Sequence, residues 1–212
     1  MYDAIGIFQN AAEIAASPFQ SAAVKPGDVK YRDTNGDNKI TSDDRIITGH
    51  TTPTISYGIN LGASFRSFDF SAFLQGVANI DTYAGLNYAT PFNNGAGVTY
   101  EWLNNSWSPE NTGAKFPRLT TSNGYPDNFK ASTLYLQDAS YLRLKNIQLG
   151  YSLPKTLTDK IKIKRARIYV NGQNLLTVSN MKIVDPERSI QTANFYQYPS
   201  TKIYTMGVNV TF

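Results

Sequence analysis

Apolar and polar residues alternate along several stretches of the chain, and a period of two indicates β-strands with one apolar and one polar face. In residues 55–65 every odd position is Ile, Tyr, Leu, Ala or Phe, and every even position is Gly, Ser or Asn. After Arg66 and Ser67 the pattern resumes over 68–75, and it returns in the last ten residues, with apolar residues at even positions up to Phe212. These stretches predict three strands.

Residues 141–153 and 166–176 alternate less regularly and predict two more strands. Their apolar positions are Ile147, Leu149, Tyr151, Ala166, Ile168 and Val170. Most of the expected strands exceed the five or six residues usual in globular proteins. Eleven residues at about 3.3 Å each, tilted by about 40°, rise roughly 28 Å, which is enough to cross the apolar band of a membrane.

Two architectures produce this alternation. In a soluble sandwich the apolar faces meet in a core, whereas in an outer-membrane barrel they meet lipid and the polar faces line the lumen. Strand length and the Gly, Ser, Asn and Gln of the polar faces favour the barrel. We therefore expect an all-β protein, an antiparallel transmembrane β-barrel fragment, because five strands cannot close a barrel.

The expected connections alternate between short and long, as do the periplasmic turns and extracellular loops of outer-membrane barrels. We expect long extracellular loops at about 77–140 and 177–202, and short turns at the opposite end. This order places Phe212, at the C-terminus, on the periplasmic side. Residues 1–54 are expected to form an extracellular segment, and residues 55–212 the strands and their loops.

Composition excludes several other functions. The 212 residues contain no cysteine, so a disulfide framework or a thiolate site cannot form. His50 is the single histidine, which leaves a catalytic triad or a histidine metal cluster without members, and we expect no enzyme. A net charge of +4 is too low to suggest a nucleic-acid partner. No apolar run is long enough for a transmembrane helix, and no signal peptide is evident.

Residues 33–44 have the spacing of a twelve-residue calcium loop, whose ligands stand at positions 1, 3, 5, 7, 9 and 12. Two positions depart from the pattern: Asn38 replaces the usual glycine at position 6, and position 12 is Asp rather than Glu. Before the loop, 29–31 is expected to be extended. The alternative is a surface loop of Asx-turns without an ion. The candidate ligands for a structural Ca²⁺ are Asp33, Asn35, Asp37, Lys39 (through its carbonyl), Thr41 and Asp44.

Several motifs, in the same order, resemble the SusC/RagA family of TonB-dependent outer-membrane transporters. They are PGDVKY at 26–31 followed by the calcium-type loop, ASYLRLKN at 139–146, LGYSLP at 149–154, NGQNLL at 171–176 and DPE at 185–187. The resemblance covers nearly the whole chain. It implies about the last five strands of a 22-stranded barrel.

The resemblance also implies the function and the partners of the intact protein. Family members import glycans, and in some cases peptides, across the outer membrane. A SusD-like surface lipoprotein forms a lid, and the TonB system supplies energy through an N-terminal part that this chain lacks. The alternative from another class is a secreted calcium-loop β-sandwich that binds carbohydrate or a surface protein.

Three further features are candidates for contacts. The 77–140 segment is rich in aromatic residues, which can stack on sugars or contact the lid, or can instead pack a core of the segment itself, with a short helix expected within 101–107. Cations at 155–167, around the turn between the third and fourth predicted strands in chain order, face anionic lipid or only solvent. Phe212 resembles the C-terminal signal that the barrel-assembly machinery reads. The candidate ligand or lid residues are Tyr83, Tyr88, Phe92, Tyr100, Trp102, Trp107 and Tyr125.

Overall fold

The computed structural model describes residues 1–84, 91–92, 95, 97–121, 126–181, 185–187 and 200–212. The chain divides into two compact units. The first contains residues 1–49 and 82–137, and the second contains 50–81, 138–187 and the last strand.

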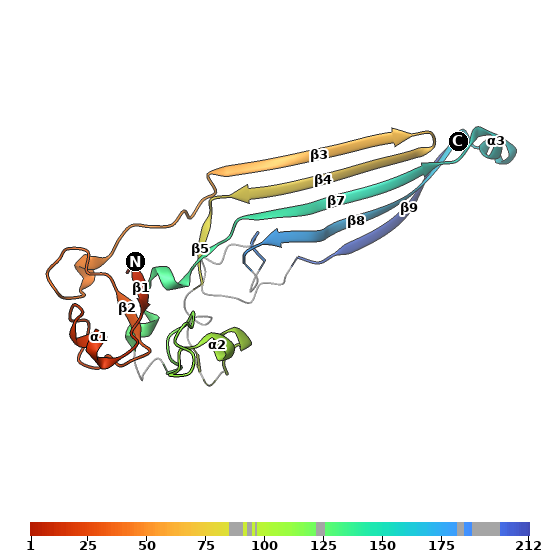
Figure 1. Ribbon diagram of the computed structural model, residues 1–212. Coiled ribbons are helices and arrows are strands. Elements are labelled where there is room, and N and C mark those ends of the chain that lie inside the picture. The colour runs from red at the N-terminus through yellow and green to blue at the C-terminus, as the bar shows by residue number, and fades with distance from the viewer. Residues whose placement is uncertain (85–90, 93–94, 96, 122–125, 182–184, 188–199) are drawn as a thin grey trace. The chain divides into compact units, whose positions relative to one another are not determined.

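The second unit is one antiparallel five-stranded sheet with the strand order β3-β4-β7-β8-β9 (Figure 1). All five predicted strands are confirmed, with small changes at their ends. Their bounds are β3 Ile55–Phe65, β4 Phe68–Ala78, β7 Tyr141–Ser152, β8 Arg165–Ser179 and β9 Ile203–Thr211.

The pairing register carries each face across all five strands. One apolar row is Phe65, Phe68, Tyr151, Ile168 and Val208, and the next is Ala63, Phe70, Leu149, Val170 and Met206. The polar row between them on the opposite face is Ser64, Asp69, Gly150, Tyr169 and Gly207. Directly paired residues point to the same side of a sheet, so the predicted separation of apolar and polar faces is confirmed.

Neither face of this sheet is covered by a second β-layer among the described residues. Tyr57, Ile59, Val208 and Val210 would be buried in a sandwich, yet they are 37–60% exposed. Strands β3 and β9 form the two edges of the sheet. The described structure is therefore a single wall with a wide exposed apolar face, and the sandwich alternative is wrong for this part of the chain.

A β-bulge at Lys145 explains why the third predicted strand alternated less regularly. Phe73 pairs with Asn146 and Leu74 pairs with Leu144, so Lys145 has no partner in β4. The extra residue shifts the alternation by one position. Leu142 and Leu144 therefore lie on the same apolar face as Ile147, although they occupy even positions.

Short and long connections alternate as expected. Residues 66–67 join β3 to β4, and residues 153–164 join β7 to β8 through α3 (Lys155–Thr158) and η5 (Asp159–Ile161). Both short connections and the C-terminus lie at the same end of the sheet (Figure 1). Within the part of the chain that the structure describes, no helix has the length and apolar character needed to cross a membrane.

The first unit is built from short elements around two small cores. Strand β2, which matches the extended segment expected there, pairs antiparallel with β1. One core contains Tyr2, Val29, Tyr31 and Ile40, and the other contains Trp102, Phe116 and Tyr135. Its elements are β1 Ala4–Ile7, α1 Ala11–Ala15, β2 Val29–Tyr31, η1 Ser42–Asp44, α2 Tyr100–Asn105, η3 Pro126–Phe129 and η4 Thr133–Tyr135, with β5 Asp81–Tyr83 and β6 Leu136–Asp138 forming a further two-stranded sheet.

Asp28 joins distant segments of this unit. Its carboxylate is fully buried, pairs with the Arg118 guanidinium at 2.7 Å and accepts a hydrogen bond from Asn128 Nδ2 at 2.9 Å. The Asn128 side chain in turn accepts from the backbone N–H of Val29 at 2.8 Å. Much of the predicted loop at 77–140 is therefore tied to the N-terminal segment.

Candidate functional site

The polar face of the five-stranded sheet carries small and amide side chains, with a few ionic groups at fixed positions. At the turn end, Arg167 forms an ion pair with Asp69 two strands away. Gly150 of β7 lies between them, and a Cβ there would lie 2.2 Å from Arg167 Nη2. The glycine leaves the space that the guanidinium occupies, so the sequence pattern of small residues has a steric reason.

A second ionic cluster lies around Arg143 on β7 and ties the connection after β8 to the sheet. Its guanidinium is 3% exposed and bonds Asp185, Glu187, Ser200 Oγ and Thr177 Oγ1. Lys145, the bulge residue, pairs with Glu187 as well. The DPE motif stands out in the sequence only as a family resemblance, and two of its residues pair with these cations.

The Asp185 carboxyl is held in its ionised form by this cluster. Burial alone would raise the pKa of Asp185, but hydrogen bonds from Arg143 and Ser200 outweigh it and hold the pKa well below its ordinary value. The Asp185 carboxyl is therefore ionised at neutral pH, beside the Arg143 guanidinium.

In the predicted calcium loop, the carboxylates accept hydrogen bonds from backbone N–H groups of the same loop. Asp33 accepts from the N–H groups of Gly36 and Asn38 at 2.7 and 2.8 Å, and Asp37 accepts from that of Lys39 at 2.8 Å. Asn38 takes the left-handed conformation, with φ of 61°, that position 6 requires.

The end of the loop is held by Asp44, which is fully buried. Its carboxylate accepts hydrogen bonds from the N–H groups of Thr41 and Thr34 at 2.7 and 2.8 Å. The bond from Thr41 contributes most to a pKa of Asp44 below its ordinary value. Across the described residues, no three Asp, Glu or His side chains lie close enough together to hold a metal ion. The backbone thus has the curvature of a calcium loop, while its acidic side chains bond to the loop itself.

The candidate contact aromatics that the structure describes fall into three groups. Trp102 is buried in α2 and stacks on Phe116 with ring centroids 4.4 Å apart, and Tyr83 packs edge-on against Tyr135. Trp107 donates its indole N–H to Gln9 at 2.9 Å. Tyr100 and Phe92 remain exposed. Tyr88 and Tyr125 lie outside the described residues. The alternative that these aromatics pack a core of their own therefore holds for Trp102, which lies in the expected short helix, α2. The expectation that this helix also includes Trp107 is wrong, because α2 ends at Asn105.

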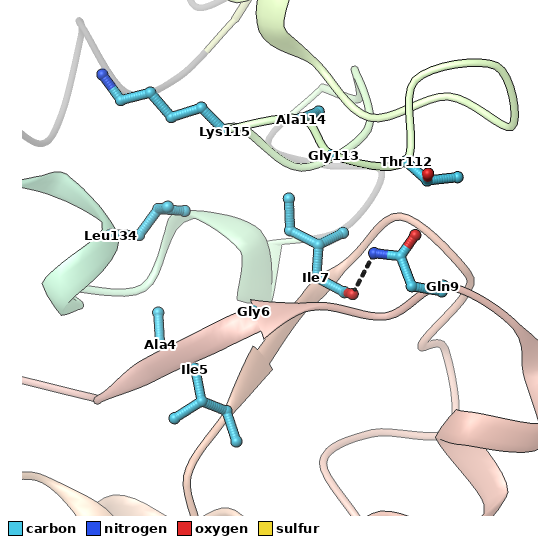
Figure 2. A pocket seen from close by; sticks show the side chains of 10 residues that line it. All are labelled: Ala4, Ile5, Gly6, Ile7, Gln9, Thr112, Gly113, Ala114, Lys115 and Leu134. Atoms are coloured by element: carbon cyan, nitrogen blue, oxygen red, sulfur yellow. Dashed lines mark hydrogen bonds between the residues drawn. The ribbon is translucent and has the colours of Figure 1, made fainter.

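A pocket of about 420 Å³ lies in the first unit, between β1 and the 112–115 loop (Figure 2). Ile7 and Leu134 point toward this loop, whereas Ile5 points to the other side of β1 (Figure 2). Lys115 is the one charged residue of its lining, and its amino group pairs with Glu101 at 2.8 Å. None of the ten lining residues is Asp, Glu or His, so the pocket presents no carboxylate or imidazole.

The remaining candidates lie at the two ends of the sheet. Phe212 follows β9 directly and is 80% exposed. His50 lies near Asp81, whose carboxylate is 3.6 Å from His50 Nδ1. Among the cations predicted at 155–167, Arg167 lies in β8 and forms an ion pair with Asp69.

Comparison with known proteins gives a consistent set of relatives, although no family model matches the chain. The chain is 31% identical over 220 residues to the TonB-dependent receptor P26 of Formosa agariphila, covering 98% of this chain and 22% of the relative. It is also 31% identical over 192 residues to the TonB-dependent receptor SusC of Bacteroides thetaiotaomicron, covering 89% and 18% respectively.

Solved structures agree. The RagAB peptide importer in its "open-open" state matches with a TM-score of 0.71 and 28% identity, and in its "closed-closed" state with 0.75 and 26%. Each match covers all of this chain and 22% of the other. The relatives are receptors and not enzymes, in agreement with the sequence analysis. The predicted resemblance is confirmed: over its whole length the chain is homologous to one part of the SusC/RagA-type TonB-dependent receptors, and it spans about 22% of their length.

Proposed function

We propose that this chain supplies C-terminal barrel strands of a SusC/RagA-like TonB-dependent importer in the outer membrane. The apolar face of the five-stranded sheet contacts lipid, and the polar face lines the lumen. The C-terminus lies on the periplasmic side, and the long connections lie outside.

One observation carries this proposal, namely the apolar rows that continue across all five strands while their side chains remain exposed. A soluble protein rarely exposes a contiguous apolar area of this kind. Hydrocarbon chains would cover it without a second protein layer, since a barrel wall needs none.

Substitution of neighbouring residues on β7 tests this proposal in the intact transporter. Ile147→Arg places a cation in lipid and should cost about 2–4 kcal/mol near the middle of the membrane. Gln148→Arg places the same cation toward the lumen and should be nearly neutral. Membrane insertion is followed by heat-modifiable migration in gels, and equal insertion of both variants would contradict the proposed orientation.

We propose further that the intact protein imports oligosaccharides or peptides together with a SusD-like surface lipoprotein, and that the TonB system acts on parts outside this chain. The support is homology to SusC and to the RagAB peptide importer. Uptake of labelled oligosaccharides and peptides by cells with and without the gene tests the substrate class. Co-purification of the intact protein with a surface lipoprotein tests the proposed partner.

Exposed aromatics of the first unit are candidates for substrate or lid contacts. Tyr100 is 83% exposed, so Tyr100→Ala removes a large side chain without opening a core. Reduced uptake or reduced lipoprotein binding by this variant supports a contact role, and unchanged values for both remove Tyr100 from it.

We also propose that the 33–44 loop binds Ca²⁺ as a structural ion. Its ligand spacing and the left-handed Asn38 support this, and the carboxylates of Asp33 and Asp37 keep lone pairs for an ion beside the N–H groups that they bind. Calorimetry on the intact protein should show binding that Asp33→Ala and Asp37→Ala abolish. Asp43→Ala is the control, since position 11 supplies no ligand. Binding heat unaffected by the first two substitutions would exclude the site.

For Phe212 we propose a role as the C-terminal signal for barrel assembly. Its deletion should reduce insertion of the full-length protein, and normal insertion would exclude the role.

A further inference from the structure

One end of the five-stranded sheet is rimmed by exposed cations. We name this set the basic rim, and it consists of Arg66, Lys155, Lys160, Lys162, Lys164 and Arg165. In the described part of the chain, none of the six forms an ion pair, whereas Arg167 beside them is neutralised by Asp69. Asp159 is the one exposed acidic side chain in the β7–β8 connection. The rim therefore carries a large uncompensated positive charge.

The backbone fixes the rim at the end of the apolar face. The Lys164 N–H donates to the Thr211 carbonyl at 2.9 Å, and the Ser152 N–H donates to the Ser67 carbonyl at 2.8 Å. These two bonds hold the β7–β8 connection to the last strand and to the β3–β4 turn. The cations of three chain segments thus lie along one edge and not in separate loops.

Exposed apolar side chains lie directly beside these cations. Phe65 and Phe68 end the apolar rows at this edge, and the Arg66 guanidinium lies over the Phe65 ring, 5.2 Å from its centre. Leu157 of α3 is also exposed, at 51%. Aromatic rings beside Lys and Arg are typical of the boundary between hydrocarbon and headgroups, where long cationic side chains reach the polar layer.

The chemistry that fits this arrangement is a layer of phosphate groups. Lysines near a membrane surface are attracted to anionic headgroups. An acidic protein would also attract the cations of the rim. It would not explain why these cations lie directly beside the exposed apolar face of the sheet. A lipid surface explains both features together.

We propose that the basic rim binds the phosphate groups of anionic phospholipids, specifically phosphatidylglycerol or cardiolipin, in the leaflet that the turns face. This inference rests on the proposed membrane orientation of the sheet. The rim enriches anionic phospholipids over neutral ones among the lipids that surround the transporter. It also fixes how far the short turns lie from the hydrocarbon layer.

Boundary-lipid selectivity of the intact transporter tests this inference. The protein is reconstituted in phosphatidylcholine vesicles that contain spin-labelled phosphatidylglycerol or spin-labelled phosphatidylcholine, and electron paramagnetic resonance measures the fraction of each label that the protein immobilises. We expect the wild-type protein to immobilise the anionic label more strongly, by about twofold. The preference should fall at 1 M salt, about seven times physiological ionic strength.

Matched variants separate charge from structure. Lys160→Gln/Lys164→Gln should lose most of the preference, and Lys160→Arg/Lys164→Arg should keep it. Lys25→Gln/Lys202→Gln, which removes two exposed cations that are not part of the rim, should also keep it. Equal selectivity in the wild-type and Lys160→Gln/Lys164→Gln proteins overturns the inference. This is also the result expected if the rim binds an acidic protein instead of lipid. If the wild-type protein immobilises no label of either kind, the proposed membrane orientation itself fails.

Discussion

At the scale of single residues, glycines decide where large side chains can lie on the sheet. Gly76 of β4 pairs with Tyr57 of β3, whose ring covers it. A Cβ on Gly76 would stand 2.4 Å from Tyr57 Cζ and 2.5 Å from the Tyr141 carbonyl oxygen. Since one of these obstacles is backbone, the strand has little freedom to adapt.

Gly76→Ala should therefore destabilise the sheet by about 1–3 kcal/mol, the usual cost of overpacking. Gly62→Ala on β3 is the control, because nothing lies within 4 Å of its Cβ position. The urea dependence of unfolding in detergent micelles measures both variants. Equal loss of stability in the two would show that backbone propensity and not close approach governs these positions.

Arg143 illustrates how burial changes the worth of an ion pair. Arg143→Met leaves the buried Asp185 carboxylate without its cation and should cost about 3–5 kcal/mol. The exposed pair between Arg32 and Asp3, at 2.7 Å, should cost no more than about 1 kcal/mol when Arg32→Met breaks it. The urea dependence of unfolding measures the loss of stability in both variants. Similar losses would contradict the claim that the Arg143–Asp185 pair is worth more because it is buried.

The same cluster predicts a pH dependence. The folded pKa of Asp185 lies below the unfolded value of about 3.9, so its stabilising effect is fully present above that value and is lost as the pH falls through the folded pKa. Protease cleavage of the 177–202 connection should be unchanged between about pH 7 and pH 5 and should rise below about pH 4. Arg143→Met should be cleaved readily at neutral pH, and resistance equal to the wild type would contradict this role.

At the scale of elements, the strands were predictable because each needs only its own period of two. The bulge at Lys145 was not predictable. Its one extra residue puts Leu142 and Leu144, at even positions, on the same face as the apolar residues at odd positions later in the strand. The cluster that Arg143 forms with residues 40 or more positions away was also beyond local patterns. Pairing across long separations has no signature in a single sequence.

Deletion of single residues from β7 tests the bulge. Without Lys145 the strand alternates regularly, so both faces remain correct and the transporter should still insert. Deletion of Gly150 instead moves Ile147 and Leu149 to the polar face and Asn146 and Gln148 to the apolar face, and it should block insertion. Heat-modifiable migration follows both, and failure of the Lys145 deletion alone would contradict this account of the register.

At the scale of the molecule, the sequence predicted a wall of strands but not the makeup of the first unit. Asp28 is buried with Arg118 and Asn128, about ninety and one hundred residues further along. The PGD motif around it was noticed as a family resemblance, while its physical reason is this buried carboxylate. Trp102 was a candidate contact residue and lies in a core, since aromatic composition alone does not distinguish packing from exposure.

The central claim is that the apolar face of the sheet contacts hydrocarbon. The chain has no cysteine, so a single cysteine can be introduced at one position at a time and carry a spin label. The positions are Leu149, Val170 and Met206 on the apolar face, and their polar neighbours Gln148, Asn171 and Thr205. In the intact transporter in vesicles, relaxation by oxygen and by a water-soluble nickel complex measures what each label contacts. The account predicts that oxygen relaxes the first three and nickel the second three. Water exposure of the first three, or burial of all six from both reagents, would contradict it.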